Sequence, residues 1–495
     1  MKKILFTALV LAGTMVNAQK NTLLDPGFWK GTPDVAAVQA EIKKGNNPAE
    51  LNPSAFDPVV LAINNNAPTA TIKFLLEQPG NSVNKVTHDS RIYLHWAAGR
   101  GNAELVSLLL SKGSDMHLED SHGSTPIVFA ANGGQTNTAI YDAFFKAGID
   151  PKQKYKEGVN LLLLAIPNDK ELMLADYFAS KGISLQDTDS NGHTAFDYAA
   201  RSGSIPLLKA LLAKGVRPTD YALITAAQGA RRSANTIEVY QYLLDALKLN
   251  PIVINKNGQS VLHLLAGKDK QTEIVNYFIA KGVDVNRADK DGNTALMEAA
   301  AGRDVQLLNV LLSKTKKINA INNKGETALA MAVKSSTAEV VSLLLDQGAN
   351  VHAVSDNGYN LAYYLVEGYR TPRPGAGAQQ DDFSDKLKVL QQKGLDLAAP
   401  QKDGNTLYHM AVVKNDLALL QKLSGLSIDV NAANAEGMTV LHKAAMIAQD
   451  DAILKYLLSI GAKKDSKTEF DETAFDLAQE NELLEKNKIA TDFLK

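Results

Sequence analysis

Apolar residues recur along this chain at spacings that fit one face of an α-helix. Leu207, Leu208, Leu211 and Leu212 stand at positions i, i+1, i+4 and i+5, and the same spacing returns at 340–345. Such a stripe lies on one side of a helix with 3.6 residues per turn, so it predicts helices that bury this side. A glycine follows the stripe where a left-handed residue can end a helix, at Gly113, Gly182, Gly215, Gly282, Gly348 and Gly461.

A shorter apolar segment precedes each striped helix and carries its own start signal. A threonine that can cap a helix stands before this segment at four places, and Pro126 occupies the first helical position at a fifth. Pairs of alanines within the segment allow neighbouring helices to approach closely, because a methyl group occupies little space. The threonines are Thr194, Thr294, Thr327 and Thr439, and the alanine pairs stand at 97–98, 130–131, 199–200, 226–227, 299–300 and 444–445.

One phrase, Gly-x-Thr followed by two apolar residues, opens most of these helix pairs. Its glycines mostly stand 33 to 35 residues apart, and a gap of 66 equals two repeats of 33. Self-similarity at a fixed period of this size indicates a solenoid of stacked repeats, of which we count about fourteen from residue 20 to residue 495. The glycines are Gly123, Gly158, Gly192, Gly258, Gly292, Gly325, Gly358, Gly404 and Gly437.

The fullest copy of the phrase, residues 437–445, reads Gly-Met-Thr-Val-Leu-His-Lys-Ala-Ala. It resembles the ankyrin-repeat phrase Gly-x-Thr-Pro-Leu-His-x-Ala-Ala, and other copies follow in register over about 300 residues. The resemblance implies an all-α ankyrin-repeat solenoid of helix-turn-helix units, with β-hairpin loops along one edge. The final unit is rich in acidic residues, as expected of a polar C-terminal cap.

Two units depart from the period. The hairpin between Gly215 and Ala226 is about six residues short, and the link at 228–236 compensates for it. We therefore expect a break in the hairpin edge and a kink near residue 220. This divides the repeats into an N-terminal block, 19–219, with degenerate first copies, and a C-terminal block, 220–495.

The second departure is an insertion of Pro and Gly residues at 369–382, between the two helices of the eleventh unit. One interpretation is a tolerated surface insertion, because repeat loops accept extra residues at little cost. The other is a partner contact through Tyr369, Arg370 and Arg373, since Tyr and Arg are favoured at binding hot spots.

The first 18 residues have the pattern of a secretory signal peptide. Lys2 and Lys3 precede an apolar run from Ile4 to Val16, and Val16-Asn17-Ala18 resembles a cleavage site. No cysteine follows it for lipid attachment, and no later apolar run is long enough to span a bilayer. We expect a soluble periplasmic or secreted protein of the bacterial exported type.

The composition of the chain excludes several classes of function. The chain has 52 Lys+Arg against 54 Asp+Glu, a formal net charge of -2, which gives no general attraction for nucleic acid. It has no cysteine, which excludes disulfides, thiolate zinc sites, iron–sulfur clusters and cysteine nucleophiles. No catalytic motif and no cofactor motif is present.

The histidines follow the repeat instead of forming a reaction centre. His95, His263, His409 and His442 all stand five residues after the phrase glycine or its equivalent, where other units hold apolar residues. This position therefore tolerates apolar groups, and the resemblance to the ankyrin family implies that these histidines hydrogen-bond neighbouring loops and helices. The one weak candidate for a metal site is a loop with His117, Glu119 and His122, whose residue types could ligate zinc or copper. Ordinary polar loop residues also explain this cluster.

The first functional hypothesis is a non-enzymatic scaffold, a monomer, that binds a protein partner through its concave face and hairpin tips. The family uses the residues around the phrase glycine and the exposed end of the first helix, and charges of both signs there favour a folded protein partner. The alternatives are an exported metal-handling or stress-protective factor, a hydrolase with an unrecognised site, or tip charges that only keep the edge soluble. The family positions map to Lys290, Asp291, Asn293, Asn323, Lys324, Glu326, Lys334, Lys402, Asp403, Asn405 and Lys414.

Overall fold

The computed structural model describes residues 20–229, 234–371 and 382–495. The predicted signal peptide, 1–18, lies outside these residues, as do Arg373 and most of the predicted insertion. The chain separates into two compact units, with the boundary between Thr219 and Asp220. Within the described residues, 28 α-helices follow one another as fourteen pairs.

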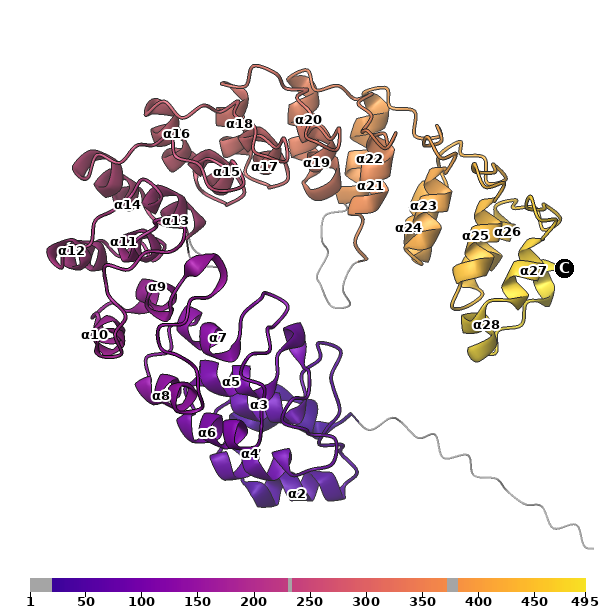
Figure 1. Ribbon diagram of the computed structural model, residues 1–495. Helices are drawn as coiled ribbons and strands as arrows, with labels where there is room; N and C mark the ends of the chain where they lie inside the picture. The colour runs from indigo at the N-terminus through magenta and orange to yellow at the C-terminus, as the bar shows by residue number, and fades with distance from the viewer. Residues whose placement is uncertain (1–19, 230–233, 372–381) are drawn as a thin grey trace, which may run out of the picture. The chain divides into compact units, whose positions relative to one another are not determined.

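The first unit contains twelve helices, coloured indigo to magenta in Figure 1. The first helices of successive pairs pack on one another from α3 to α11, and second helices such as α6 and α8 form a parallel layer. The helices are α1 Pro26–Lys30, α2 Val35–Lys43, α3 Pro58–Asn64, α4 Thr69–Leu76, α5 Tyr93–Arg100, α6 Ala103–Ser111, α7 Pro126–Asn132, α8 Thr138–Lys146, α9 Leu161–Ala165, α10 Met173–Ser180, α11 Ala195–Ala200 and α12 Ile205–Ala213.

The second unit repeats this two-layer stack. First helices pack in sequence from α13 to α27, and second helices pack from α14 to α22. The helices are α13 Ala222–Gln228, α14 Ile237–Gln241, α15 Val261–Ala266, α16 Thr272–Ala280, α17 Ala295–Ala300, α18 Val305–Leu312, α19 Ala328–Ser335, α20 Ala338–Asp346, α21 Leu361–Gly368, α22 Asp382–Gln392, α23 Leu407–Val413, α24 Leu417–Leu423, α25 Val440–Ile447, α26 Ala452–Ser459, α27 Ala474–Gln479 and α28 Glu482–Lys486.

The local signals act as the sequence indicates. The hydroxyls of Thr194, Thr327 and Thr439 accept the amide hydrogen three residues on and so cap α11, α19 and α25. The striped faces are buried, as at Val340, Val341 and Leu344 in α20. Each such side chain contributes about 1.5–3 kcal/mol by leaving water. The predicted all-α repeat solenoid is therefore confirmed.

The connecting loops are hairpins with very short arms. Among the described residues the only bridges are isolated antiparallel ones, such as Ala288 with Thr294 and Ile321 with Thr327. The chain turns around one glycine, so each arm has room for a single bridging residue. Three of the predicted β-hairpin loops thus carry one bridge each, and the described residues contain no extended strand.

The seventh and eleventh units are irregular. α13 begins at Ala222 without a side-chain cap, and α14 continues into one π-helical turn, Tyr242–Ala246. The described start of the predicted insertion, residues 369–371, follows α21 directly. Its predicted last residue, Asp382, is instead the first residue of α22. The chain thus resumes helix one residue sooner than the sequence pattern suggests.

Candidate functional site

The hairpin tips of the second unit are tied to one another by backbone hydrogen bonds. The Lys290 amide donates to the carbonyl of Asn257 at 2.9 Å, and the Asn323 amide donates to the carbonyl of Asp291 at 2.8 Å. The same bond joins Ala435 to Asp403 at 2.9 Å. Asp356 donates in the same way to Lys324 at 3.1 Å, so the four tips from Asn257 to Asp356 are held in register and form a pre-organised edge.

The phrase glycine makes this close approach possible. Gly292 has φ +81°, and a Cβ atom there would stand 2.9 Å from the Cα of Asn322 and from the amide nitrogen of Asn323. A side chain would thus collide with the neighbouring tip and would also strain the backbone. Gly325 and Gly404 meet the backbone of the next tip in the same way, so contact between units explains the phrase glycine at these three positions.

Five of the predicted partner-binding residues are exposed at these tips. They carry both signs of charge, with a lysine next to an acid or an amide in each tip. The exposed residues are Lys290, Asp291, Asn323, Lys324 and Lys402.

Three other predicted partner-binding residues make hydrogen bonds within the row of tips. The Asn293 and Glu326 side chains both accept hydrogen bonds of 3.0 Å from the Asn322 amide group, and Asn405 accepts one of 3.0 Å from Asn434. These residues are half-buried. Their polar groups already join one tip to the next, so they position the edge more than they offer it to a partner. Asp403 is also half-buried and accepts a hydrogen bond of 2.7 Å from the Asn405 amide group.

Lys334 and Lys414 form one cluster at the ends of the first helices. The ammonium of Lys334 lies 3.5 Å from one carboxylate oxygen of Glu367, and that of Lys414 lies 3.9 Å from the other. Lys414 also donates to the Glu367 carbonyl at 3.1 Å. Three successive repeats thus share one acid here, and the cluster carries a net positive charge.

The three predicted contact residues of the insertion differ in their surroundings. Tyr369 is only 8% exposed, and its ring packs edge-on against Phe383 with centroids 5.5 Å apart. Tyr369 therefore offers little surface to a partner, because its ring packs between α21 and α22. Arg370 is exposed and donates to the Glu367 carbonyl at 2.9 Å. Arg373 lies outside the described residues.

The sequence analysis missed a row of exposed apolar side chains beside the tips. Ile254 is 39% exposed, Ile321 58% and Val354 56%, and Ala288 occupies the same position between them. Each stands four residues before the phrase glycine of its unit. The signal was available in the repeat alignment, but apolar character alone does not distinguish an exposed loop position from a buried one.

The repeat histidines bridge neighbouring units as expected. Nε2 of His263 lies 3.1 Å from the Asn293 carbonyl, and its Nδ1 lies 3.2 Å from the amide and 2.9 Å from the hydroxyl of Ser260. His95, His409 and His442 make the corresponding contact to the next repeat. Burial lowers the pKa of His95, His263 and His409, against the opposing effect of these carbonyl contacts.

The proposed metal cluster does not assemble. His117, Glu119 and His122 are all exposed, and His122 instead approaches Asp89 at 3.4 Å. Arg91 lies 3.0 Å from the same carboxylate, and this fixed positive charge opposes a cation. In the described part of the chain no group of three or more His, Asp or Glu side chains is placed to hold a metal ion.

Across residues 20–229, 234–371 and 382–495, no helix has the length and apolar character needed to cross a bilayer. Family comparisons address the repeats directly. A family model described as ankyrin repeats (3 copies) matches residues 59–152, 223–322 and 265–355, and one described as ankyrin repeats (many copies) matches 408–458. Together the matched ranges cover more than half of the chain. The chain belongs to the ankyrin-repeat family.

Curated relatives match only through parts of their length. The palmitoyltransferase AKR1 of Lachancea kluyveri is 31% identical over 30% of this ankyrin-repeat chain and 21% of that protein. The ankyrin repeat and KH domain-containing protein mask-1 of Caenorhabditis elegans is 28% identical over 42% of the chain and 8% of that protein. The probable 26S proteasome regulatory subunit p28 of Saccharomyces cerevisiae is 30% identical over 26% of the chain and 57% of that protein. The chain thus spans less than two thirds of each of these relatives.

Proposed function

We propose that the chain is an exported, non-enzymatic scaffold that binds a folded protein partner through its hairpin tips and the exposed ends of its first helices. The observation that carries this proposal is the apolar row Ile254, Ala288, Ile321 and Val354, which runs beside charged tips. Apolar side chains left in water beside a polar rim are typical of protein-binding surfaces.

The construction of the edge supports the same function. Backbone hydrogen bonds hold successive tips in register, so little conformational freedom is lost when a partner docks. Lys290 beside Asp291 and Lys402 beside Asp403 present both charges, which suits a protein with mixed charge better than a polyanion. The relative p28 is named as a regulatory subunit of a protein assembly, which is consistent with a binding role.

Export is the second part of the proposal. It is supported by Lys2, Lys3 and the apolar run from Ile4 to Val16, which have the pattern of a signal peptide. Cleavage after Ala18 would leave a mature chain beginning at Gln19. In this form the scaffold acts as a monomer in the periplasm or outside the cell.

Affinity capture from the exported fraction tests the binding surface. The full chain is used as bait beside two variants, Lys290→Glu with Lys402→Glu, and Ile321→Asp with Val354→Asp. A matched control, Asn309→Asp with Lys388→Glu, changes exposed residues of second helices α18 and α22.

We expect one partner to be recovered with the wild type and the control and lost with both tip variants. Because all these side chains are exposed or on loops, circular dichroism should show an unchanged helix content. Equal recovery with all four baits would contradict the proposed surface, and retention of residues 1–18 in the purified native protein would contradict export.

A further inference from the structure

The turn that follows α18 is built differently from its neighbours. After α16, α20 and α22 the chain turns through Gly282, Gly348 and Gly394, whose φ angles are +91°, +91° and +90°. Thr315 stands at the corresponding position and is not among the residues with positive φ. A β-branched residue avoids that region, and its hydroxyl donates instead to the Leu311 carbonyl at 2.8 Å.

This change removes an apolar side chain from the space between two repeats. The residue after the glycine is buried in the other turns, as Val283, Ala349 and Leu395 are. Its amide donates back to the preceding helix, as from Val283 to Phe278 at 3.2 Å. Lys316 takes this place, remains exposed and donates its amide to Asn286 Oδ1 at 2.7 Å.

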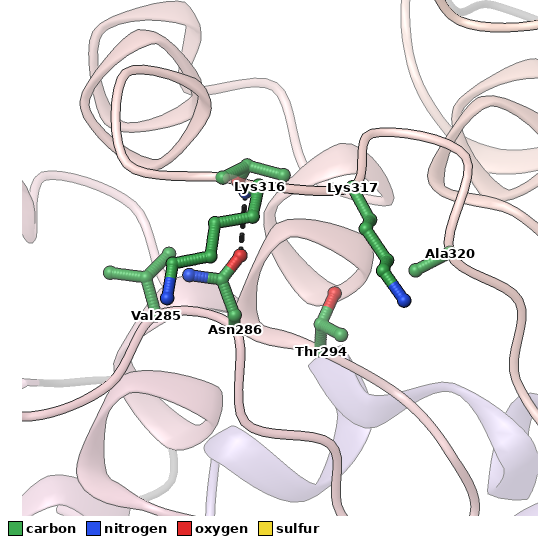
Figure 2. A pocket seen from close by; sticks show the side chains of 7 residues that line it. Val285, Asn286, Thr294, Lys316, Lys317 and Ala320 are labelled. Atoms are coloured by element: carbon green, nitrogen blue, oxygen red, sulfur yellow. Dashed lines mark hydrogen bonds between the residues drawn. The ribbon is translucent and has the colours of Figure 1, made fainter.

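A cavity of about 230 Å³ lies beside this turn, and Thr315, Lys316 and Lys317 line it. Figure 2 shows Lys316 passing over Asn286 and Val285, while Lys317 extends towards Thr294 and Ala320. A water molecule occupies about 30 Å³ in the liquid, so the cavity is large enough for a short polar side chain with some water.

The charged groups around this cavity are two ammonium groups without a matching acid. No residue that lines it is acidic. Within the described residues, neither ammonium group of Lys316 and Lys317 has a hydrogen bond or an ion pair. The Thr294 hydroxyl accepts from the Met297 amide at 3.4 Å, so its own proton is left to donate. Val285 and Ala320 supply apolar wall beside these donors.

We propose that this cavity binds the carboxylate of an acidic side chain in a segment of the protein partner. Two ammonium groups and one hydroxyl supply charge-assisted hydrogen bonds, and the apolar wall packs against the methylene stem. The proposal deepens the proposed function and rests on it. It names an acidic anchor in the partner for a site whose lining residues are none of the tip residues assigned above.

The site is tested on the full chain with small probes, because it does not require the partner to be known. The probes are N-acetyl-glutamate N-methylamide, its neutral glutamine analogue and inorganic phosphate. Methyl NMR signals of Val285, Thr294 and Ala320 report binding at the cavity, and those of Ala349 report the next turn.

We expect the glutamate probe to give saturable shifts at the cavity methyl groups and none at Ala349. The glutamine analogue and phosphate should each bind at least about tenfold more weakly, since one lacks the charge and the other the apolar stem. Replacing both lysines, Lys316→Gln with Lys317→Gln, should remove the glutamate shifts. The control Lys463→Gln with Lys464→Gln changes the lysine pair of a later turn, where Ala462 is buried, and should leave them unchanged.

Equal binding of the glutamine analogue, tighter binding of phosphate, or no saturable shift would each overturn the carboxylate site. These outcomes leave the tip variants of the capture experiment unaffected. Conversely, probe binding without any captured partner would contradict the proposed scaffold function while the site itself stands.

Discussion

Replacing the bridging histidine His263 with methionine should change how stability depends on pH. The neutral ring accepts from Ser260 at Nδ1 and donates to the Asn293 carbonyl at Nε2. Protonation would place a proton on Nδ1, opposite the Ser260 amide hydrogen. His263 is 3% exposed, and this burial lowers its pKa below the value of the unfolded chain.

The sign of the effect follows from proton linkage. Below about pH 6.5 the unfolded chain binds more protons at this ring than the folded chain does, so stability falls as the pH falls. The slope from one such histidine is at most about 1.4 kcal/mol per pH unit. His263→Met removes this slope, and it also removes hydrogen bonds worth about 1–3 kcal/mol near neutral pH.

Met297 already occupies the equivalent buried position of the next repeat, so the methionine fits. We therefore expect the variant to be less stable near pH 7.5, with the difference from wild type shrinking as the pH falls towards about 5. Urea titrations followed by pulsed hydrogen exchange of the peptides that cover α15 measure this difference. Met297→Leu is the control and should lower stability by the same amount at every pH. Parallel curves for wild type and His263→Met would refute the reasoning.

Three further perturbations test the packing between repeats. Gly348→Ala adds a Cβ that meets no atom within 4 Å, so it should lower the free energy of unfolding by about 1–2 kcal/mol, the cost of the left-handed backbone. Gly292→Ala also places a Cβ against the next tip and should lower the free energy of unfolding by more. Thermal melts compare the two variants. Lys386 is buried against two carbonyls at the end of α19, and this burial lowers its pKa to about 8. The folded chain therefore holds fewer protons than the unfolded chain between about pH 8 and 10.4, so local stability should rise with pH there by up to about 3 kcal/mol. Hydrogen exchange of α19 measures this stability, and Lys386→Met should abolish its rise with pH. Asp245→Asn weakens an exposed ion pair of 2.7 Å with Lys281, the residue that follows α16. Urea titrations should show only a small loss of stability, and this loss should vanish at high salt.

The repeated features were predictable because each of them is local. The threonine caps, the terminal glycines and the histidine bridges depend on residues within one unit and on a neighbour of the same kind. Aligning the repeats on the phrase glycine therefore predicts which residues surround each cap, terminal glycine and bridging histidine. The histidine contacts show this most clearly, since the position alone predicted a structural role.

The features that sequence analysis missed depend on contacts specific to one place. Tyr369 sits in a Pro- and Gly-rich stretch and suggests a surface residue, yet it packs on Phe383 across the insertion. Lys386 belongs to a charged segment, but its ammonium reaches the carbonyls of Val333 and Ser336 at the end of another repeat. The Lys316 turn departs from the apolar position in the sequence, but only the structure shows that Thr315, Lys316 and Lys317 line a cavity.

Site-specific photo-crosslinking tests the central claim most directly. A photoreactive side chain at Ile321, in the exposed apolar row, is compared with one at Asn309, which is exposed on the second helix α18. The account predicts that the probe at 321 crosslinks one exported protein in living cells and that the probe at 309 does not. Crosslinking of that partner from 309 and not from 321 would contradict the account.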